Sequence, residues 1–205
     1  MPLSAPDLVA GYSTGIFPMA GDDGSIDWYR PDPRAVIPLD EFHVPSSLAR
    51  VVRSGRFQIT TDMAFPEVMR ACADRRSTWI NDEIVTAYVA LHEIGLAHSV
   101  ESRGMGGELQ GGLYGVALGG AFFGESMFSR ATDASKVALV HLVERMRRGG
   151  FTLLDTQFLT DHLMRFGATL IRRREYERRL VQALALPADW YALDGPATEA
   201  GTAGG

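Results

Sequence analysis

Short apolar stretches alternate with polar segments along the whole chain, and their spacing predicts a mixture of helices and strands. The stretches 97–101, 108–118 and 120–127 follow one another through glycine-containing turns, which is typical of an antiparallel meander. Elsewhere apolar residues recur every three or four positions, as in amphipathic helices. The expected helices are 5–14, 46–53, 62–72, 81–95, 132–148, 158–166 and 174–185, and further strands are expected at 36–39, 57–60, 151–155 and 168–171.

In the second half of the chain the expected order is helix, three antiparallel strands, helix, strand, helix, strand. This order predicts an α+β protein whose main part is an acetyltransferase-like (GNAT-like) mixed β-sheet with a splayed central cleft. We expect a small N-terminal α+β domain at 1–75 and the GNAT-like domain at 76–193. Residues 194–205 are rich in Gly, Ala and Thr, which predicts a disordered tail.

Composition places the chain among ordinary globular proteins. It has 205 residues, of which 46% are apolar and 22% charged, and no apolar run approaches the length of a membrane-spanning helix. The N-terminus lacks a basic segment followed by an apolar one, and the single cysteine cannot form an internal disulfide. We therefore expect a cytoplasmic protein that does not associate with membranes.

Charge is distributed unevenly along the chain. Residues 145–179 carry nine arginines and four acidic residues, whereas the chain as a whole has a net charge of −5. A basic segment in an acidic protein suggests a polyanionic partner, because guanidinium groups bind phosphate through two hydrogen bonds at once. A genome that favours arginine codons would produce the same composition, so the two explanations stay open.

Polar residues end two neighbouring apolar stretches. The stretch 120–123 runs into Gly124–Arg130, and the stretch 151–154 runs into Asp155-Thr156-Gln157. Because ligands commonly bind at the mouth formed by strand ends, we expect one cleft shared by both segments. Glu125 then either binds an amine there or pairs with Arg130.

Asp155 and Gln157 are two positions apart, so their side chains share a face if the strand continues through them. Together they can orient a nucleophile or accept its proton. Alternatively, they cap the helix expected near Phe158. Similarly, Ser129–Lys136 either presents a helix N-terminus to phosphate or is ordinary capping.

The sequence lacks the motifs of several common enzyme classes. No His-x-x-x-His pair, Gly-x-Ser-x-Gly elbow, phosphate-binding P-loop or Rossmann fingerprint occurs. No Arg/Gln-x-x-Gly-x-Gly loop follows the strand 120–127, which argues against acetyl-CoA as the donor. We therefore expect neither a metal nor a cofactor.

Several longer stretches together resemble one family, the leucyl/phenylalanyl-tRNA–protein transferases, over nearly the whole chain. The similar stretches are Gly15–Met19, Trp28–Arg34, Phe42–Val44, Thr78–Ile80, Tyr88–Glu93, Ala97–Glu101, Gly111–Val116, Gly124–Arg130, Ala134–Lys136 and Leu154–Gln157. The resemblance implies transfer of Leu, Phe or, less well, Met from charged tRNA to proteins that begin with Arg or Lys. The product is a peptide bond that marks the acceptor for degradation (the N-end rule).

The resemblance also implies roles for individual residues. Asp155, Gln157 and Glu125 match catalytic positions. The positions that match the aminoacyl-adenosine pocket are Trp28, Trp79, Leu113, Phe122, Ser126 and Leu142. At Leu142 and Thr160 the sequence departs from the family pattern.

Basic side chains should hold the tRNA body. Our candidates are Arg70, Arg75, Arg76, Arg130, Lys136, Arg172, Arg173 and Arg174. We expect the protein to act as a monomer. The alternatives are another GNAT-fold aminoacyl-tRNA-dependent ligase or acyltransferase, and a non-catalytic RNA- or peptide-binding module.

Overall fold

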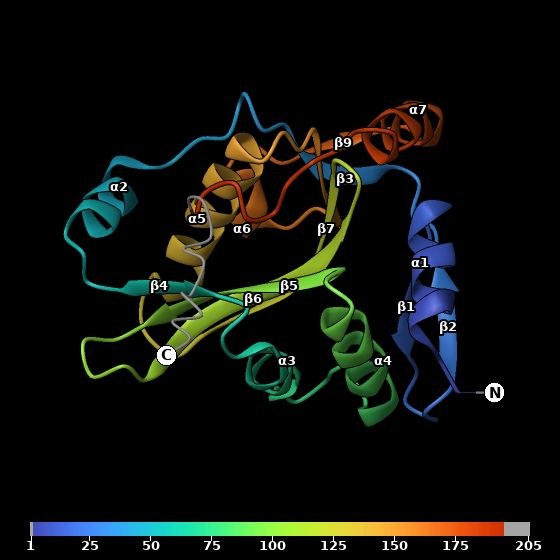
Figure 1. Cartoon of the computed structure of the whole chain (residues 1–205), viewed down its shortest axis with the longest axis horizontal. Coiled ribbons are helices and arrows are strands. Elements are labelled where there is room, and N and C mark those ends of the chain that lie inside the picture. Colours follow the sequence, from blue (N-terminus) through green and yellow to red (C-terminus); the bar gives the residue numbers. More distant parts are fainter. Residues whose placement is uncertain (1, 195–205) are drawn as a thin grey trace, which may run out of the picture.

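The computed structural model describes residues 2–194, which build one large mixed sheet covered by helices on both faces (Figure 1). The sheet has seven strands in the order β4-β5-β6-β7-β8-β3-β9, and only β7 and β8 run parallel to each other. The mixed sheet expected from the sequence is therefore confirmed. The strands are β3 (Arg34–Ile37), β4 (Gln58–Thr61), β5 (Ala97–Arg103), β6 (Leu109–Leu118), β7 (Ala121–Ser129), β8 (Leu153–Gln157) and β9 (Thr169–Ile171).

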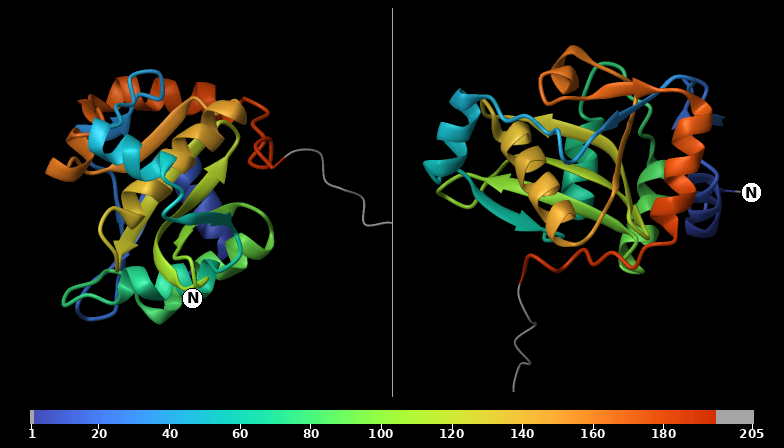
Figure 2. Two further views of the ribbon diagram at one scale, coloured as in Figure 1. Left: turned by 90° about the vertical axis from the view of Figure 1, so that its left-hand side faces the viewer. Right: turned by 90° about the horizontal axis from the view of Figure 1, so that it is seen from above.

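Helices pack on both faces because side chains of the central strands alternate between two apolar cores. On β7, Phe122 belongs to one core and Phe123 to the other. The core containing Phe123 is covered by α1 (Ala5–Ser13), α3 (Phe65–Ala73), α4 (Asp82–Glu93) and α7 (Arg173–Leu184). The core containing Phe122 is covered by α2 (Ser46–Arg53) and α5 (Ala134–Arg148), and Figure 2 shows α5 lying along the sheet.

The parallel pair β7–β8 separates part of the way along its length. Their last paired residues are Phe123 and Asp155, yet β7 continues to Ser129 and β8 to Gln157. Beyond this point β7 pairs only with β6, while β8 pairs with β3. The splayed cleft predicted from the order of elements is therefore present between β7 and β8.

The expected boundary near residue 75 falls between α3 and α4. Strands β3 and β4 precede it in the sequence, yet both belong to the seven-stranded sheet. Outside this sheet lies a hairpin of β1 (Phe17–Ala20) and β2 (Ile26–Tyr29), which the sequence analysis did not predict. Each strand has only four residues, and Pro18 interrupts the apolar pattern of the first.

Two other segments differ from the expected elements. The helix expected at 158–166 is reduced to α6 (Asp161–Met164), because Thr160 caps the helix through its side chain and Gly167, with φ of 91°, ends the turn that follows. Of the expected tail at 194–205, only Asp194 lies within the described residues. Its carboxylate is paired with Arg145 at 2.6 Å. Within residues 2–194, no helix is both long and apolar enough to cross a lipid bilayer.

Candidate active site

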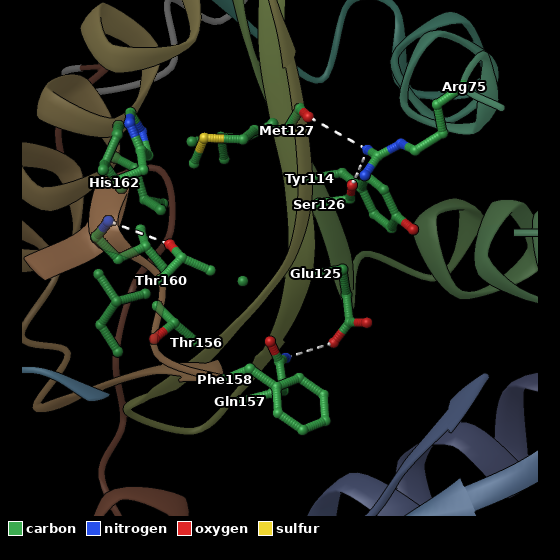
Figure 3. Close-up of a pocket in the computed structure, with 16 residues that line it drawn as sticks. Arg75, Tyr114, Glu125, Ser126, Met127, Thr156, Gln157, Phe158, Thr160 and His162 are labelled. Carbon is green, nitrogen blue, oxygen red and sulfur yellow. Dashed lines mark hydrogen bonds between the residues drawn. The ribbon is translucent and has the colours of Figure 1, made fainter. Parts of the chain in front are cut away.

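An amide–carboxylate pair lies where β7 and β8 separate. The Nε2 of Gln157 donates a hydrogen bond of 2.9 Å to Oε1 of Glu125, as Figure 3 shows. Gln157 ends β8 with φ of 56°, a left-handed conformation that is uncommon for residues other than glycine. Strain of this kind is retained only where surrounding contacts hold the residue, so the position of this amide is a specific feature of the site.

The carboxylate of Asp155 stabilises the left-handed conformation of Gln157. Its Oδ1 accepts the backbone N–H of Gln157 at 2.9 Å, and Tyr176 donates its hydroxyl to Oδ2 at 2.7 Å. Arg34 donates Nε to Oδ1 at 2.9 Å and Nη2 to Oδ2 at 2.7 Å. The carboxylate has no exposed surface, and both of its oxygens accept hydrogen bonds.

Arg34 makes several further contacts besides its ion pair with Asp155. Such contacts are needed, because a buried ion pair is favourable only when its remaining hydrogen-bonding groups are satisfied. Its guanidinium lies between the rings of Phe17 and Tyr176, 4.8 and 4.7 Å from their centroids. Its Nη1 donates to the carbonyl oxygen of Gly15 at 3.2 Å. Arg34 thereby links Gly15 and Phe17 to Asp155 and Tyr176, which are distant in the sequence.

Glu125 lies in a different electrostatic environment. Burial raises its pKa from the ordinary value of 4.5 to about 8, and a hydrogen bond from Tyr12 opposes this rise. The nearby charge of Asp155 raises the pKa further, whereas Arg34 and a hydrogen bond from Tyr88 lower it. The two carboxylates thus differ in environment: Asp155 is in a buried ion pair with Arg34, whereas the raised pKa of Glu125 lets it exchange a proton near neutral pH.

A cavity of about 280 Å³ extends from this pair into the cleft. Glu125, Gln157 and Arg75 supply charged and polar groups to its wall. The apolar part of the wall consists of Leu113, Met127, Leu139, Leu142, Leu154, Phe158 and Leu163. The cavity therefore suits an apolar group that is joined to a polar, reacting centre.

Three polar atoms of the wall lack a partner. Within residues 2–194, the buried side-chain atoms without a hydrogen bond are the hydroxyl of Tyr114, Oγ1 of Thr156 and Nε2 of His162. All three residues line this cavity. Because a buried polar group without a partner is costly, their concentration in one wall favours a ligand-binding role for it.

The substrate-binding residues expected from the sequence separate into two groups. Leu113, Ser126 and Leu142 line the cavity. Phe122 does not: it has no exposed surface, and its ring stacks on that of Trp190 with the ring centroids 5.3 Å apart.

Neither of the two expected tryptophans lines this cavity. Trp28 is on β2, 38% exposed, and borders a separate cavity with Pro2 and Glu83. Trp79 precedes α4 and packs against the other apolar core, and its carbonyl oxygen accepts the N–H of Ala20.

The expected tRNA-binding residues lie in three places. Arg70, Arg75, Arg76 and Arg130 lie in or after α3 and at the end of β7, and a cavity of about 260 Å³ includes Arg75 and Arg130. Lys136 is on α5 and pairs with Asp133 at 2.7 Å. Arg172, Arg173 and Arg174 are exposed at the start of α7, which lies at the opposite edge of the molecule from α3 (Figures 1 and 2).

Several alternatives raised by the sequence can now be decided. Glu125 bonds to Gln157, whereas Arg130 donates to the carbonyl oxygen of Leu109, so these two charges are not paired. Asp155 does not cap a helix, since Thr160 caps α6. Asp133 is the N-terminal flanking residue of α5 but makes no capping hydrogen bond with its side chain.

Sequence reasoning missed Arg34, Tyr176, Thr156 and His162 as parts of the site. Arg34 and Asp155 are 121 positions apart, so no local pattern connects them. Thr156 lies between two expected catalytic residues, and this position in the sequence could have indicated that it belongs to the site. Among residues 2–194, no cluster of three or more His, Cys, Asp or Glu side chains is arranged to hold a metal ion.

The family profiles that match this chain and the three relatives named below share one description. The family profile "Leucyl/phenylalanyl-tRNA protein transferase" matches residues 36–181, and the profile of the N-terminal domain of the same family matches residues 1–32. The relatives include leucyl/phenylalanyl-tRNA–protein transferases from Salinibacter ruber, 56% identical over 92% of this chain and 84% of that protein, and from Paramagnetospirillum magneticum, 58% identical over 93% of each. The enzyme from Herpetosiphon aurantiacus is 60% identical over 89% of this chain and 95% of its own length.

Two solved structures are also similar. One is L-PGS from Bacillus licheniformis, with a TM-score of 0.42 and 13% identity over 80% of this chain and 56% of that one. The other is the C-terminal domain of a putative lysylphosphatidylglycerol synthetase from Agrobacterium fabrum, with a TM-score of 0.42 and 12% identity over 94% and 63%. The matches in sequence extend across the sheet, the cleft and the Gln157–Glu125 pair, and the chain therefore belongs to the leucyl/phenylalanyl-tRNA–protein transferase family.

Proposed function

We propose that this aminoacyltransferase moves Leu, Phe or, less readily, Met from a charged tRNA to the α-amino group of proteins that begin with Arg or Lys, marking them for degradation. The observation that carries the proposal is the apolar cavity that ends at the Gln157–Glu125 pair. An aminoacyl group fits such a cavity with its side chain against the leucines and its ester against the polar end.

The apolar wall accounts for the choice of donor. Leu113, Leu142 and Leu163 offer contacts to unbranched or γ-branched side chains but no partner for a polar one. Methylene-scale differences contribute only about 1–3 kcal/mol to discrimination, so rejection of Ile and Val requires close contact near Cβ. Leu142 and Thr160, where the sequence departs from the family pattern, both lie in this wall and are expected to tune the preference.

The reaction needs no energy source beyond the ester itself. The acceptor amine attacks the ester carbon, a C–N bond forms, the C–O bond to the ribose breaks, and the amine proton is finally transferred to the ribose oxygen. In our proposal Gln157 orients the amine and Glu125 accepts its proton, for which a pKa near that of an α-amine is suitable. Asp155 contributes by holding Gln157, and alignment of this kind can contribute about 7–11 kcal/mol to lowering the barrier.

The acceptor and the tRNA body are expected to contact charged surfaces outside the cavity. Acidic side chains outside the cavity attract the cationic first residue of the acceptor, and the three groups of basic residues attract the tRNA phosphates. We propose that the protein acts as a monomer and in the cytoplasm, where charged tRNA is available.

A transfer assay tests the proposal. Leu-, Phe-, Met- and Ile-tRNA are each incubated with matched peptides that begin with Arg, Lys or Ala, and mass spectrometry follows the addition of one residue. We expect extension of the Arg and Lys peptides with Leu and Phe, less with Met, and none with Ile. Equal extension of the Ala peptide, or transfer of Ile, would contradict the proposed specificity.

A further inference from the structure

The cavity of about 280 Å³ has two different ends (Figure 3). His162 lies at one end and separates the cavity from a second one of about 410 Å³. Gln157 and Glu125 lie at the opposite end, where the proposed function places the ester. Because the ester is made to the ribose of the terminal nucleoside, the ribose and its base must leave the cavity at the end formed by Gln157 and Glu125.

An exposed aromatic ring borders this end of the cavity. Phe158 directly follows Gln157, lines the cavity and is 49% exposed. Its ring contacts that of Phe17 edge-on, with the centroids 5.8 Å apart, and the ring of Phe17 stacks on that of Tyr29 at 6.1 Å. Phe17 is buried, whereas Tyr29 is 40% exposed. Two exposed rings from distant segments are therefore held beside the cavity by contact with one buried ring.

The exposed aromatic side chains of residues 2–194 are concentrated in this region. Those more than a third exposed are Trp28, Tyr29, Phe158 and Tyr191. Tyr191 donates its hydroxyl to Asp62, and Trp28, which precedes Tyr29 on β2, packs on Gly11 of α1. Tyr29 and Phe158 are thus the exposed pair that shares a contact with Phe17. Aromatic surface left in water beside a reaction site favours a ligand that covers it.

Exposed cations lie close to the hairpin that carries Tyr29. Arg30 follows Tyr29, and its Nη1 is 3.8 Å from Oε1 of Glu177 on α7. The backbone N–H of Arg173, the first residue of α7, donates to Oδ1 of Asp32 at 3.1 Å. These contacts bring the exposed start of α7 beside the segment that follows the hairpin. A nucleic-acid strand that passes Tyr29 therefore meets cations for its phosphates.

We propose that Phe158 and Tyr29 form a stacking platform for the single-stranded 3′ end of the donor tRNA, with the terminal base on Phe158 and the preceding base on Tyr29. Every base has a flat π-face, so such a platform holds a strand without reading its sequence. The backbone then continues towards the arginines at the start of α7. The inference rests on the proposed function and names a further subsite for the same substrate.

Two pairs of small donors test the platform, and the members of each pair differ by one base. The first pair is the leucyl ester of adenosine and that of 1-deoxyribose, which has no base. The second pair is the leucyl ester of the dinucleotide CpA and that of the same dinucleotide without its cytosine base. The measurement is kcat/KM for transfer of Leu to a peptide that begins with Arg. We expect the wild-type protein to prefer the donor with the base by at least about fivefold in each pair, as base–aromatic stacking provides.

Variants then assign each base to a ring. Phe158→Ala should abolish the preference in the first pair, and Phe158→Tyr should retain it because the ring remains. Tyr29→Ala should abolish the preference in the second pair alone, and Tyr29→Phe should retain it. Met164→Ala is the matched control, because Met164 is also 49% exposed but lies on α6, and it should retain both preferences.

A purely structural role of either ring gives a different result. If Phe158→Ala only disturbs Gln157, both donors of a pair lose activity by the same factor and the preference survives, which overturns the platform. A wild-type protein that uses both donors of each pair equally also overturns it. So does a loss in the alanine variants that is confined to KM for the acceptor peptide, since the rings would then contact the acceptor. The proposed function is judged separately, because it fails if Leu-tRNA itself yields no extended peptide.

Discussion

At the scale of single residues, the site depends on two carboxylates in opposite electrostatic situations. Asp155 is fully engaged by Arg34, Tyr176 and the backbone of Gln157. Glu125 faces the cavity, and burial raises its pKa to about 8. Asp155 is therefore expected to affect the stability of the fold and the position of Gln157, and Glu125 the transfer of a proton.

Replacing Asp155 should separate its effect on stability from its effect on catalysis. Asp155→Leu leaves Arg34 buried without its partner and should destabilise the protein by about 3–5 kcal/mol. In the double variant Arg34→Met/Asp155→Leu most of this loss should be recovered, because no buried charge remains. Transfer should stay low in both variants, since the backbone N–H of Gln157 no longer has its acceptor.

Urea unfolding and single-turnover transfer from Leu-tRNA measure the two effects. Tyr176→Phe is the milder control, because it removes one hydrogen bond to Asp155 and leaves the ion pair in place. A double variant with normal transfer would show that Asp155 does not position Gln157.

Glu125 should make the stability of the protein depend on pH. Between pH 4.5 and about 8 the folded protein holds a proton on Glu125 that the unfolded chain has released. The folded state then binds more protons than the unfolded state, so stability falls as pH rises through this window. Glu125→Gln removes this pH-dependent loss of stability, because glutamine does not titrate. The difference in unfolding free energy between Glu125→Gln and the wild type should therefore grow, in favour of the variant, from about pH 5 to about pH 8.5.

Denaturant unfolding at several pH values in this range checks the prediction. Glu93→Gln, at an exposed position of α4, controls for the simple removal of a negative charge. An advantage of Glu125→Gln that does not change with pH would show that Glu125 titrates at an ordinary pKa in the folded protein.

At the scale of elements, the cleft depends on how closely β6 and β7 approach each other. Gly115 on β6 pairs with Gly124 on β7, and the register shifts beside Gly115. A Cβ at Gly115 would collide with the carbonyl oxygen of Phe123, whereas a Cβ at Gly124 would lie 3.6 Å from the carbonyl oxygen of Asp155, an ordinary contact. These partners therefore form a matched pair for testing the packing of the strands.

Gly115→Ala should force the two strands apart where β7 begins to leave β8. We expect a destabilisation of about 1–3 kcal/mol, the usual effect of an added methyl group in a packed interior. Gly124→Ala should cost clearly less, because its methyl group has room. Thermal unfolding compares the two, and equal decreases in stability would mean that close approach at Gly115 does not determine the packing here.

At the scale of the whole molecule, the candidate tRNA-binding residues occupy separate edges. The sequence analysis had listed them together, because the sequence does not show which of them lie close to one another. Arg172, Arg173 and Arg174 begin α7, whereas Arg70, Arg75 and Arg76 lie at α3. Neutralising a phosphate releases counterions, so each cation that binds one contributes to the salt dependence of tRNA binding. The salt dependence can therefore show which edge the tRNA contacts.

Replacing Arg172, Arg173 and Arg174 together with Gln should weaken tRNA binding and flatten its salt dependence. The slope of log K against log salt should decrease in magnitude by about 0.7–0.9 for each phosphate that is no longer neutralised. The control replaces three other exposed arginines, Arg50, Arg53 and Arg56, with Gln for the same change in net charge. Filter binding at several salt concentrations gives both slopes, and equal slopes in the two variants would remove the start of α7 from the tRNA-binding surface.

Much of the architecture was predictable from the sequence because local patterns determine it. The meander at 97–127 and the amphipathic helices were predicted from the spacing of apolar residues, which depends on neighbours only a few positions away. The Glu125 and Gln157 segments were expected to meet, since both follow strands that end at one cleft, and their side chains are joined by a hydrogen bond of 2.9 Å. The order of the similar stretches identified the family.

Only the tertiary structure determined how these parts act together. Arg34 reaches Asp155 because β3 is inserted between β8 and β9, a pairing that links residues far apart in the sequence. Phe122 is absent from the cavity wall: it is fully buried and stacks on Trp190, which is distant in the sequence. His162 forms a wall between two cavities because the fold brings α6 close to the start of α5. Contacts between segments this far apart in the sequence produce no periodic pattern of residues, so the sequence could not predict them.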